Sequence, residues 1–161
     1  MPPAEIFHLL RSLFNSGKEL EEGEFERELA QLGSFSNIVT VGSGRSGFRL
    51  LLDALDFPPG SEIIFPAYTF HPMPLAAAER GLKPVFADVD RKTWNIQPEK
   101  IIPLINKKTK IIVPTHLFGV PAEMGAINEL AREHHLFVIE DCAHALGAMY
   151  GDTMVGNFGD A

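Results

Sequence analysis

Short, mostly apolar runs alternate along the chain with amphipathic stretches of helical spacing. Apolar runs of this kind are typical of parallel strands that helices cover on both faces. The pattern predicts five strands, at Asn37–Val41, Glu62–Phe65, Pro84–Ala87, Lys110–Val113 and Leu136–Glu140. Because connections of this length join parallel strands, we expect an α/β fold with a mostly parallel sheet.

The segments between these strands have the periodicity and the ends of helices. Each finishes near a Gly, a Pro, an Asn or a cluster of polar residues. The predicted helices of this region are residues 45–57, 70–80, 98–106 and 122–135. Two more helical segments, residues 2–14 and 19–32, precede the first strand. The sequence contains no internal repeat and no low-complexity linker, so it gives no reason to divide the strand region.

Composition places the chain among ordinary soluble globular proteins. Of its 161 residues, 45% are hydrophobic and 22% are charged, which suffices for a core and argues against general disorder. The net charge is −7, so we expect no nonspecific binding to nucleic acid or to an anionic membrane. The single cysteine, Cys142, excludes an internal disulfide. With no bilayer-spanning apolar run and no secretory signal pattern, we expect a cytoplasmic protein.

A predicted strand, a glycine-rich turn and a predicted helix follow one another in residues 39–48, VTVGSGRSGF. The backbone N–H groups of such a turn, with the positive end of the helix dipole, bind anions such as phosphate. Ser43, Arg45 and Ser46 add side chains that can contact phosphate directly. The alternative explanation is a tight turn that simply requires glycine.

The same segment matches the dinucleotide-binding pattern GxGxxG at Gly42, Gly44 and Gly47. A dinucleotide site also requires an acidic residue at the end of the next strand, about 20 residues on, to hold the ribose. The next predicted strand ends at Phe65, and its acidic residue, Glu62, stands at its beginning. The glycine pattern alone is therefore weak evidence for NAD(P) binding.

An aromatic residue, Phe70, follows the strand at Glu62–Phe65, and Thr69 is a candidate cap for the next helix. Phe70 and His71 would then lie at the edge of the sheet where α/β folds bind ligands. A flat ring at this position can stack on a planar cofactor. The alternative is that Phe70 packs in the core.

Two carboxylates, Glu140 and Asp141, end the last predicted strand, and His144 follows three positions after Asp141. A carboxylate at the end of such a strand binds a metal, a ribose or a protonated ring nitrogen, or else caps local backbone. Cys142 and His144 suggest a metal, but the chain offers no second Cys/His pair at a suitable spacing, so we expect no metal site. His116, at the end of another strand, can contact a ligand or form local hydrogen bonds.

These features together suggest one planar, phosphorylated cofactor that contains nitrogen, and pyridoxal phosphate fits them. From about Ser16 to Ala161 the sequence resembles the amino-terminal part of the DegT/DnrJ/StrS family of aminotransferases, which act largely on keto groups of nucleotide-linked sugars. The most specific matches occur in the family's order and spacing. They are SGKELEEGEFERELAQ, VGSGRSGFRLLLDAL, FPAYTFHPMPLAA, PVFADVDRKTWNI, PTHLFGVPAEM and IEDCAHALGA.

The resemblance implies a three-layer sandwich like the large domain of fold-type I, aspartate aminotransferase-like enzymes that use pyridoxal phosphate. The implied cofactor-binding residues are Gly44, Arg45, Ser46, Phe70, Asp141 and His144. The backbone of the first three would hold the phosphate, and Phe70 would stack on the pyridine ring. Asp141 would pair with the ring N–H and keep that nitrogen protonated, and His144 would lie near the phenolic oxygen. Arg45 stands where the family often has Thr, and His144 where Gln is common.

The family's Schiff-base lysine has no counterpart among the lysines of this chain, because family order places it after the GNFGDA segment that ends at Ala161. We therefore interpret the chain as an amino-terminal fragment that is inactive alone. Residues 1–36 would form a helical segment and residues 37–161 part of the large, cofactor-binding domain. The small carboxyl-terminal domain would be absent.

By this resemblance, the intact enzyme transfers an amino group from a donor such as glutamate to a keto sugar linked to a nucleotide. Such reactions serve polysaccharide, cell-surface glycan or antibiotic-sugar biosynthesis, and the intact enzyme would be a homodimer. Three alternatives stay open. They are a sugar dehydratase that uses pyridoxal phosphate with histidine in place of the lysine, a noncatalytic binding protein of the same fold, and an NAD(P)-dependent oxidoreductase.

Overall fold

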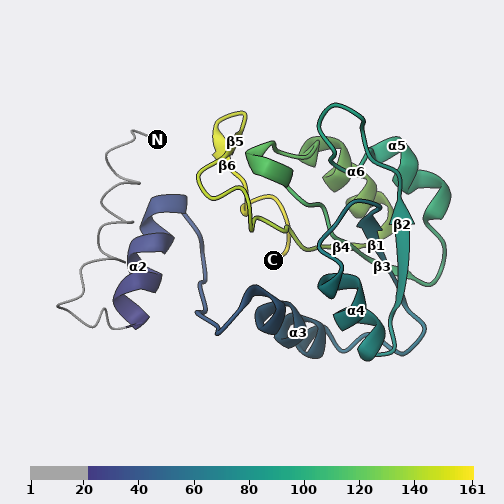
Figure 1. The fold of residues 1–161 in the computed structure, drawn as a ribbon, viewed down its shortest axis with the longest axis horizontal. Coiled ribbons are helices and arrows are strands. Elements are labelled where there is room, and N and C mark those ends of the chain that lie inside the picture. Colours follow the sequence, from purple (N-terminus) through teal and green to yellow (C-terminus); the bar gives the residue numbers. More distant parts are fainter. Residues whose placement is uncertain (1–21) are drawn as a thin grey trace. The chain divides into compact units, whose positions relative to one another are not determined.

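The computed structural model describes residues 22–161 of the chain (Figure 1). The described residues fall into two compact units that separate between Thr40 and Val41. The first unit contains α2 (Glu22–Gly33), which confirms the described part of the helix predicted at residues 19–32. The helix predicted at residues 2–14 lies outside the described residues.

Four parallel strands form the main sheet of the second unit, in the order β2-β1-β3-β4. They are β1 (Glu62–Pro66), β2 (Lys83–Ala87), β3 (Thr109–Ile112) and β4 (Phe137–Val138). A separate antiparallel pair consists of β5 (Met149–Tyr150) and β6 (Thr153–Met154). Four of the five predicted strands and the predicted α/β fold are therefore confirmed.

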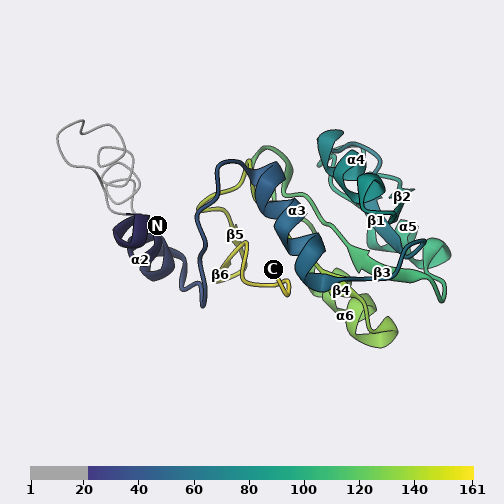
Figure 2. The ribbon, with the colours of Figure 1, turned by 90° about the horizontal axis from the view of Figure 1, so that it is seen from below.

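Helices connect the strands and cover both faces of the sheet, and in Figure 2 α3 and α6 lie on opposite sides of β4. They are α3 (Gly44–Leu55), α4 (Pro72–Glu79), α5 (Pro98–Ile101), η1 (Ile102–Leu104), η2 (Leu117–Gly119) and α6 (Met124–His134). The helix predicted at residues 98–106 divides into α5 and η1, where Pro103 lacks the N–H that would continue an α-helix. Within residues 22–161, none of the helices combines the length and the apolar character that a bilayer crossing requires.

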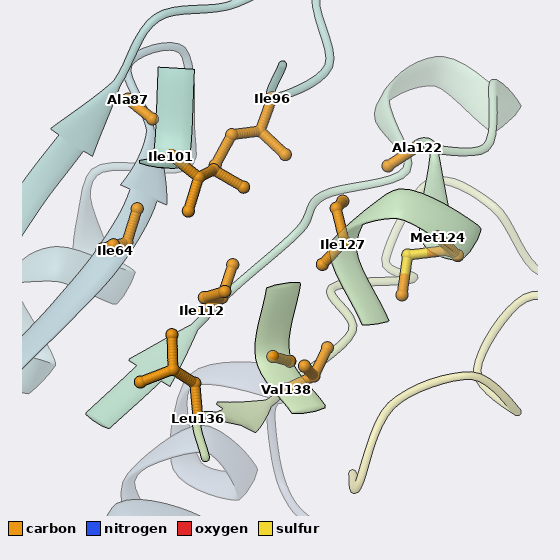
Figure 3. Close-up of a cluster of buried hydrophobic side chains, with 11 residues drawn as sticks. Ile64, Ala87, Ile96, Ile101, Ile112, Ala122, Met124, Ile127, Leu136 and Val138 are labelled. Carbon is orange, nitrogen blue, oxygen red and sulfur yellow. The ribbon is translucent and has the colours of Figure 1, made fainter. Parts of the chain in front are cut away.

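Alternation along the strands explains why their sequences are apolar throughout. Ile63 and Phe65 of β1 point to one face of the sheet and pack with Phe48 of α3. Ile64 points to the opposite face and packs in a cluster with Ile127 of α6 (Figure 3). Because each face has its own buried cluster, both sets of alternate residues must be hydrophobic.

The strand predicted at Asn37–Val41 is wrong, because the structure has no strand at these residues. Thr40 instead donates its backbone N–H and its hydroxyl to one carboxylate oxygen of Glu26, at 2.7 and 2.8 Å. Val39 is 78% exposed. A strand needs a neighbouring backbone to satisfy its N–H and C=O groups, and an apolar run alone does not supply one.

The buried cluster around Ile64 leads to a stability prediction. The Ile64 side chain is fully buried, whereas Ile102 of η1 is 53% exposed. Replacing Ile64 with Ala leaves a cavity and should lower the free energy of unfolding by about 2–5 kcal/mol. Ile102→Ala, the matched control, should change it by about 0.5 kcal/mol or less. Urea unfolding followed by circular dichroism measures both, and equal losses would contradict the packing described.

Candidate functional site

The carboxyl ends of β1, β3 and β4 meet at one edge of the sheet, where α/β folds bind ligands. Phe70 follows β1, His116 follows β3 and Asp141 follows β4. A short connection joins the end of α3 to the start of β1, so the helix runs back along the sheet and begins, at Gly44, toward that edge. The predicted turn, aromatic residue and acidic residue therefore belong to the same side of the fold.

Pairing between β3 and β4 continues past the strands as far as Asp141. The Asp141 N–H donates to the Pro114 carbonyl at 2.9 Å, and the His116 N–H donates to the Asp141 carbonyl at 3.0 Å. Because alternate residues of a strand point to opposite faces, Asp141 follows Ile139 onto the face that α3 covers. Glu140 follows Val138 onto the face that α6 covers.

The Asp141 carboxylate is partly bonded and keeps acceptor positions open. Its Oδ2 accepts from the Thr115 hydroxyl at a long 3.4 Å, and its Oδ1 accepts from the Ala143 N–H at 3.2 Å. The residue is only half-buried. Since two carboxylate oxygens offer about four acceptor sites, Asp141 can accept a further N–H from a ligand.

Helix α3 begins with a side-chain cap. Ser43 has extended backbone angles, and its Oγ accepts the Ser46 N–H at 3.1 Å. The first N–H groups of a helix have no carbonyl partner within the helix, which here concerns Gly44 and Arg45. Among the described residues, no atom outside the neighbouring residues and the helix's own backbone lies within 4 Å of the point where a Gly44 Cβ would stand, so this backbone is open to close approach. The predicted glycine-rich turn into a helix is confirmed, although residues 22–43 contain no strand.

Phe70 is 61% exposed, so the alternative in which this ring packs in the core is wrong. Its neighbour His71 is the N-cap of α4, and no side chain caps that helix. The predicted capping role of Thr69 is therefore also wrong, because the helix starts two residues further on than such a cap allows. The Thr69 hydroxyl is buried, and within residues 22–161 it has no hydrogen-bond partner.

His144 is exposed, and its imidazole stacks on the ring of Phe118. The ring centroids lie 5.7 Å apart and the planes differ by 6°. No motif in the sequence singled out Phe118. Its only signal was an aromatic residue next to Gly119 in the segment that follows β3.

Glu140 and His116 form a fully buried pair on the opposite face from Asp141. The His116 Nε2 lies 2.9 Å from Glu140 Oε2, and its Nδ1 accepts the Ala122 N–H at 3.0 Å. A ring nitrogen that accepts a hydrogen bond carries no proton, so His116 is neutral and its proton is on Nε2. The contact is therefore a hydrogen bond from a neutral imidazole to a carboxylate, and His116 bonds locally rather than to a ligand.

Three backbone N–H groups complete the surroundings of the Glu140 carboxylate. Its Oε2 also accepts from Gly156 at 2.9 Å, and its Oε1 accepts from Phe158 at 2.7 Å and Gly159 at 2.6 Å. Burial opposes ionisation, but the hydrogen bonds from His116 and these amides outweigh it and lower the pKa of Glu140. The sequence shows two carboxylates here but did not reveal this structural role of Glu140, which the alternation after Val138 could have indicated.

His116, Glu140 and Cys142 offer ligand atoms that lie within 4.8 Å of one another. Both ring nitrogens of His116 and both carboxylate oxygens of Glu140 already take part in hydrogen bonds. Burial, together with the charges of Glu140 and Asp141, raises the pKa of the Cys142 thiol to about 12. The group is therefore a hydrogen-bonded part of the core and not a set of free metal ligands.

The structure also bears on the dinucleotide pattern. Glu62 starts β1 at the amino edge of the sheet, where its carboxylate accepts from Lys83 at 2.8 Å and from Asn106 at 2.6 Å. These hydrogen bonds lower its pKa, although burial opposes the shift. The strand ends at Pro66 without a carboxylate, so β1 does not provide the acidic residue that a ribose requires.

Comparison with known proteins assigns the chain to a family. The model of the DegT/DnrJ/EryC1/StrS aminotransferase family matches residues 4–161. The chain belongs to this family. It is also similar to solved structures. NtdA from Bacillus subtilis, with bound cofactor PMP, has a TM-score of 0.75 at 31% identity, over 89% of this chain and 34% of that one.

Two curated relatives show how similar the sequences are. A UDP-N-acetyl-3-dehydro-alpha-D-glucosamine 3-aminotransferase of Acidithiobacillus ferrooxidans is 41% identical over 148 residues, which cover 92% of this chain and 39% of that protein. A pleiotropic regulatory protein of Geobacillus stearothermophilus is 37% identical over 161 residues, which cover 98% of this chain and 43% of that protein. The chain thus spans about two fifths of the length of these relatives.

The surroundings of Glu140 predict a stability loss that depends on pH. An amide at this position has one acceptor oxygen and turns its own N–H groups toward N–H donors, so Glu140→Gln should lower the free energy of unfolding by about 2–4 kcal/mol at neutral pH. Because the folded pKa of Glu140 is lowered, its carboxylate stabilises the fold above the ordinary glutamate pKa. That stabilisation disappears as the pH falls through the lowered pKa. The free energies of unfolding of the wild type and of Glu140→Gln should therefore converge in acid.

Urea unfolding at neutral and acidic pH tests this, with Glu133→Gln, at an exposed position of α6, as the matched control. The control should cost about 0.5 kcal/mol or less. A Glu140→Gln loss that stays constant into acid would contradict the argument. In the wild type, nitrogen-15 NMR should show the His116 proton on Nε2, as the acceptor role of Nδ1 requires.

Proposed function

We propose that residues 1–161 are the cofactor-binding, amino-terminal part of an aminotransferase that uses pyridoxal phosphate to aminate the keto group of a nucleotide-linked sugar. Family membership supports the class of reaction. The observation that carries the proposal is the Asp141 carboxylate, half-buried at the ligand-binding edge of the sheet with acceptor positions left open. A carboxylate with open acceptor positions can accept the N–H of a protonated ring nitrogen and balance its charge.

Pyridoxal phosphate has an anionic group, a flat ring and a ring nitrogen, and this chain offers a contact for each. For the phosphate, the N–H groups of Gly44 and Arg45 stand at the positive end of α3, over open backbone. The Ser43 cap already holds the Ser46 N–H, so Ser46 would contribute its hydroxyl, which can accept from the Ser43 hydroxyl at 2.9 Å and donate to the phosphate. For the ring, Phe70 presents an exposed aromatic face. The residues present therefore fit the cofactor.

The chain's own groups would act on the cofactor mainly through hydrogen bonds and charge. When bound, pyridoxal phosphate withdraws electrons from the substrate carbon that loses a proton. Asp141 accepts the ring N–H and keeps the proton on that nitrogen, which sustains the withdrawal. His144, three residues further on, would lie near the phenolic oxygen. Phe70 would orient the ring by stacking.

The substrate, the partner and the extent of the protein belong to the same proposal. The name of the 41% identical relative supports a nucleotide-linked keto sugar as substrate. The amino donor, such as glutamate, is part of the proposal. We propose that the Schiff-base lysine lies beyond Ala161 and that residues 1–161 are inactive alone. Residues 1–36 would be a helical segment, residues 37–161 part of the large domain, and the complete protein a cytoplasmic homodimer. Exposed apolar side chains such as Tyr68 and Leu146 support a second copy.

A noncatalytic regulatory protein of the same fold is the second candidate. The name of the 37% identical relative favours it. Borohydride reduction of the complete polypeptide with pyridoxal phosphate, followed by mass mapping, separates the candidates. An adduct on a lysine beyond Ala161 supports the aminotransferase, and cofactor binding without an adduct supports the regulatory protein or a dehydratase.

Pyridoxamine phosphate is the probe that tests the site on this chain, because it lacks the aldehyde that would react with surface lysines. Wild-type chain should bind it saturably in a fluorescence titration. Asp141→Asn loses a charge-assisted hydrogen bond and should weaken binding at least about tenfold, with the fold intact by circular dichroism. Asp152→Asn, in the exposed turn between β5 and β6, is the matched control and should bind like wild type. Equal affinities for all three proteins would refute the assigned role of Asp141.

A further inference from the structure

Phe118 combines exposure with an unfavourable backbone conformation. Its side chain is 69% exposed, although an apolar ring gains nothing from contact with water. Its φ is +52°, in the left-handed region that bulky residues rarely adopt. Core packing does not account for either feature, and left-handed residues of this kind concentrate at functional sites.

Buried hydrogen bonds on both sides hold Phe118 in this conformation. Asn95, which is 4% exposed, accepts the Leu117 N–H on its Oδ1 at 3.0 Å and donates its Nδ2 to the Val120 carbonyl at 2.8 Å. His116, two residues before Phe118, is hydrogen-bonded to Glu140. The turn is therefore fixed before and after Phe118, while the ring itself projects outward.

The ring projects onto His144. The two rings are nearly parallel, with centroids 5.7 Å apart, which is an offset-stacked arrangement. The backbones are close as well, because a Cβ added to Gly119 would lie 3.7 Å from the His144 carbonyl oxygen. The turn of Phe118 thus lies directly against the segment that carries His144.

We propose that Phe118 is a positioning residue that fixes the plane of the His144 imidazole at the cofactor site. An exposed imidazole on a loop otherwise populates several rotamers. The parallel Phe118 ring on one side excludes the rotamers that turn the imidazole out of the stacked plane. The two nitrogens at the edge of the imidazole stay available. This role rests on the proposed function, which puts His144 beside the phenolic oxygen of the cofactor.

Three substitutions test the role. Phe118→Leu keeps apolar volume without a ring, Phe118→Tyr keeps the ring, and Phe118→Gly removes the side chain where glycine is the favoured residue. Phe86→Leu is the matched control, since Phe86 is a 51% exposed phenylalanine on β2. The first measurement is the proton NMR shift of the His144 imidazole, which the Phe118 ring current displaces. The second is the affinity for pyridoxamine phosphate, and the third is the melting temperature.

We expect Phe118→Leu and Phe118→Gly to abolish the ring-current shift of His144 and to weaken pyridoxamine phosphate binding by about threefold to tenfold, the effect of one aromatic pair. Phe118→Tyr should restore both values, and Phe86→Leu should change neither. Phe118→Gly should keep or raise the melting temperature, because it relieves the left-handed backbone. If Phe118 had a merely structural role, Phe118→Gly would lower the melting temperature.

Other outcomes overturn the proposal in distinguishable ways. An unchanged His144 shift in Phe118→Leu would exclude the stacking itself. A changed His144 shift with unchanged affinity for pyridoxamine phosphate would exclude the positioning role. So would an affinity loss in Phe118→Gly that is matched by a large drop in its melting temperature. In both cases, wild-type binding would still support the proposed function. If the wild type fails to bind pyridoxamine phosphate, the proposed function fails, and the role of Phe118 fails with it.

Discussion

The buried Glu140 carboxylate is the interaction on which the ligand-binding end of the sheet depends. A buried charge is tolerated only where its hydrogen bonds are complete, and Glu140 obtains four N–H donors from two separate segments. His116 belongs to the turn after β3, and Gly156 and Phe158–Gly159 belong to the chain after β6. Neither segment can move away without depriving the buried Glu140 carboxylate of hydrogen bonds in an apolar interior.

Two neighbouring carboxylates that follow one strand therefore have different roles. Alternation sends Glu140 to the face of α6, where every acceptor position is filled, and Asp141 to the face of α3, where some stay open. The same chemical group is structural in one environment and available to a ligand in the other. Because both follow the same strand, the bonds that fix Glu140 also fix the backbone from which Asp141 projects.

Local patterns in the sequence predicted the elements that hydrophobic burial controls, which are four strands of the sheet and the helices between them. They failed at Asn37–Val41, because an apolar run does not reveal whether a neighbouring strand exists to pair with it. They also missed the pairing of Phe118 with His144. That contact depends on a left-handed turn that Asn95 holds from more than twenty residues away, and a short window of sequence carries no signal of it.

Cys142 follows directly after Asp141, and its thiol has a pKa raised to about 12 by burial and by the two carboxylates beside it. The nucleophilic form of cysteine is the thiolate, so at physiological pH this sulfur is nearly inert. On the proposed function, an aldehyde cofactor would be held a few residues from a cysteine that does not compete for its carbonyl carbon. Burial of the thiol, reinforced by the negative charge that prepares the site for a protonated ring, thus also protects the cofactor from an unwanted covalent side reaction.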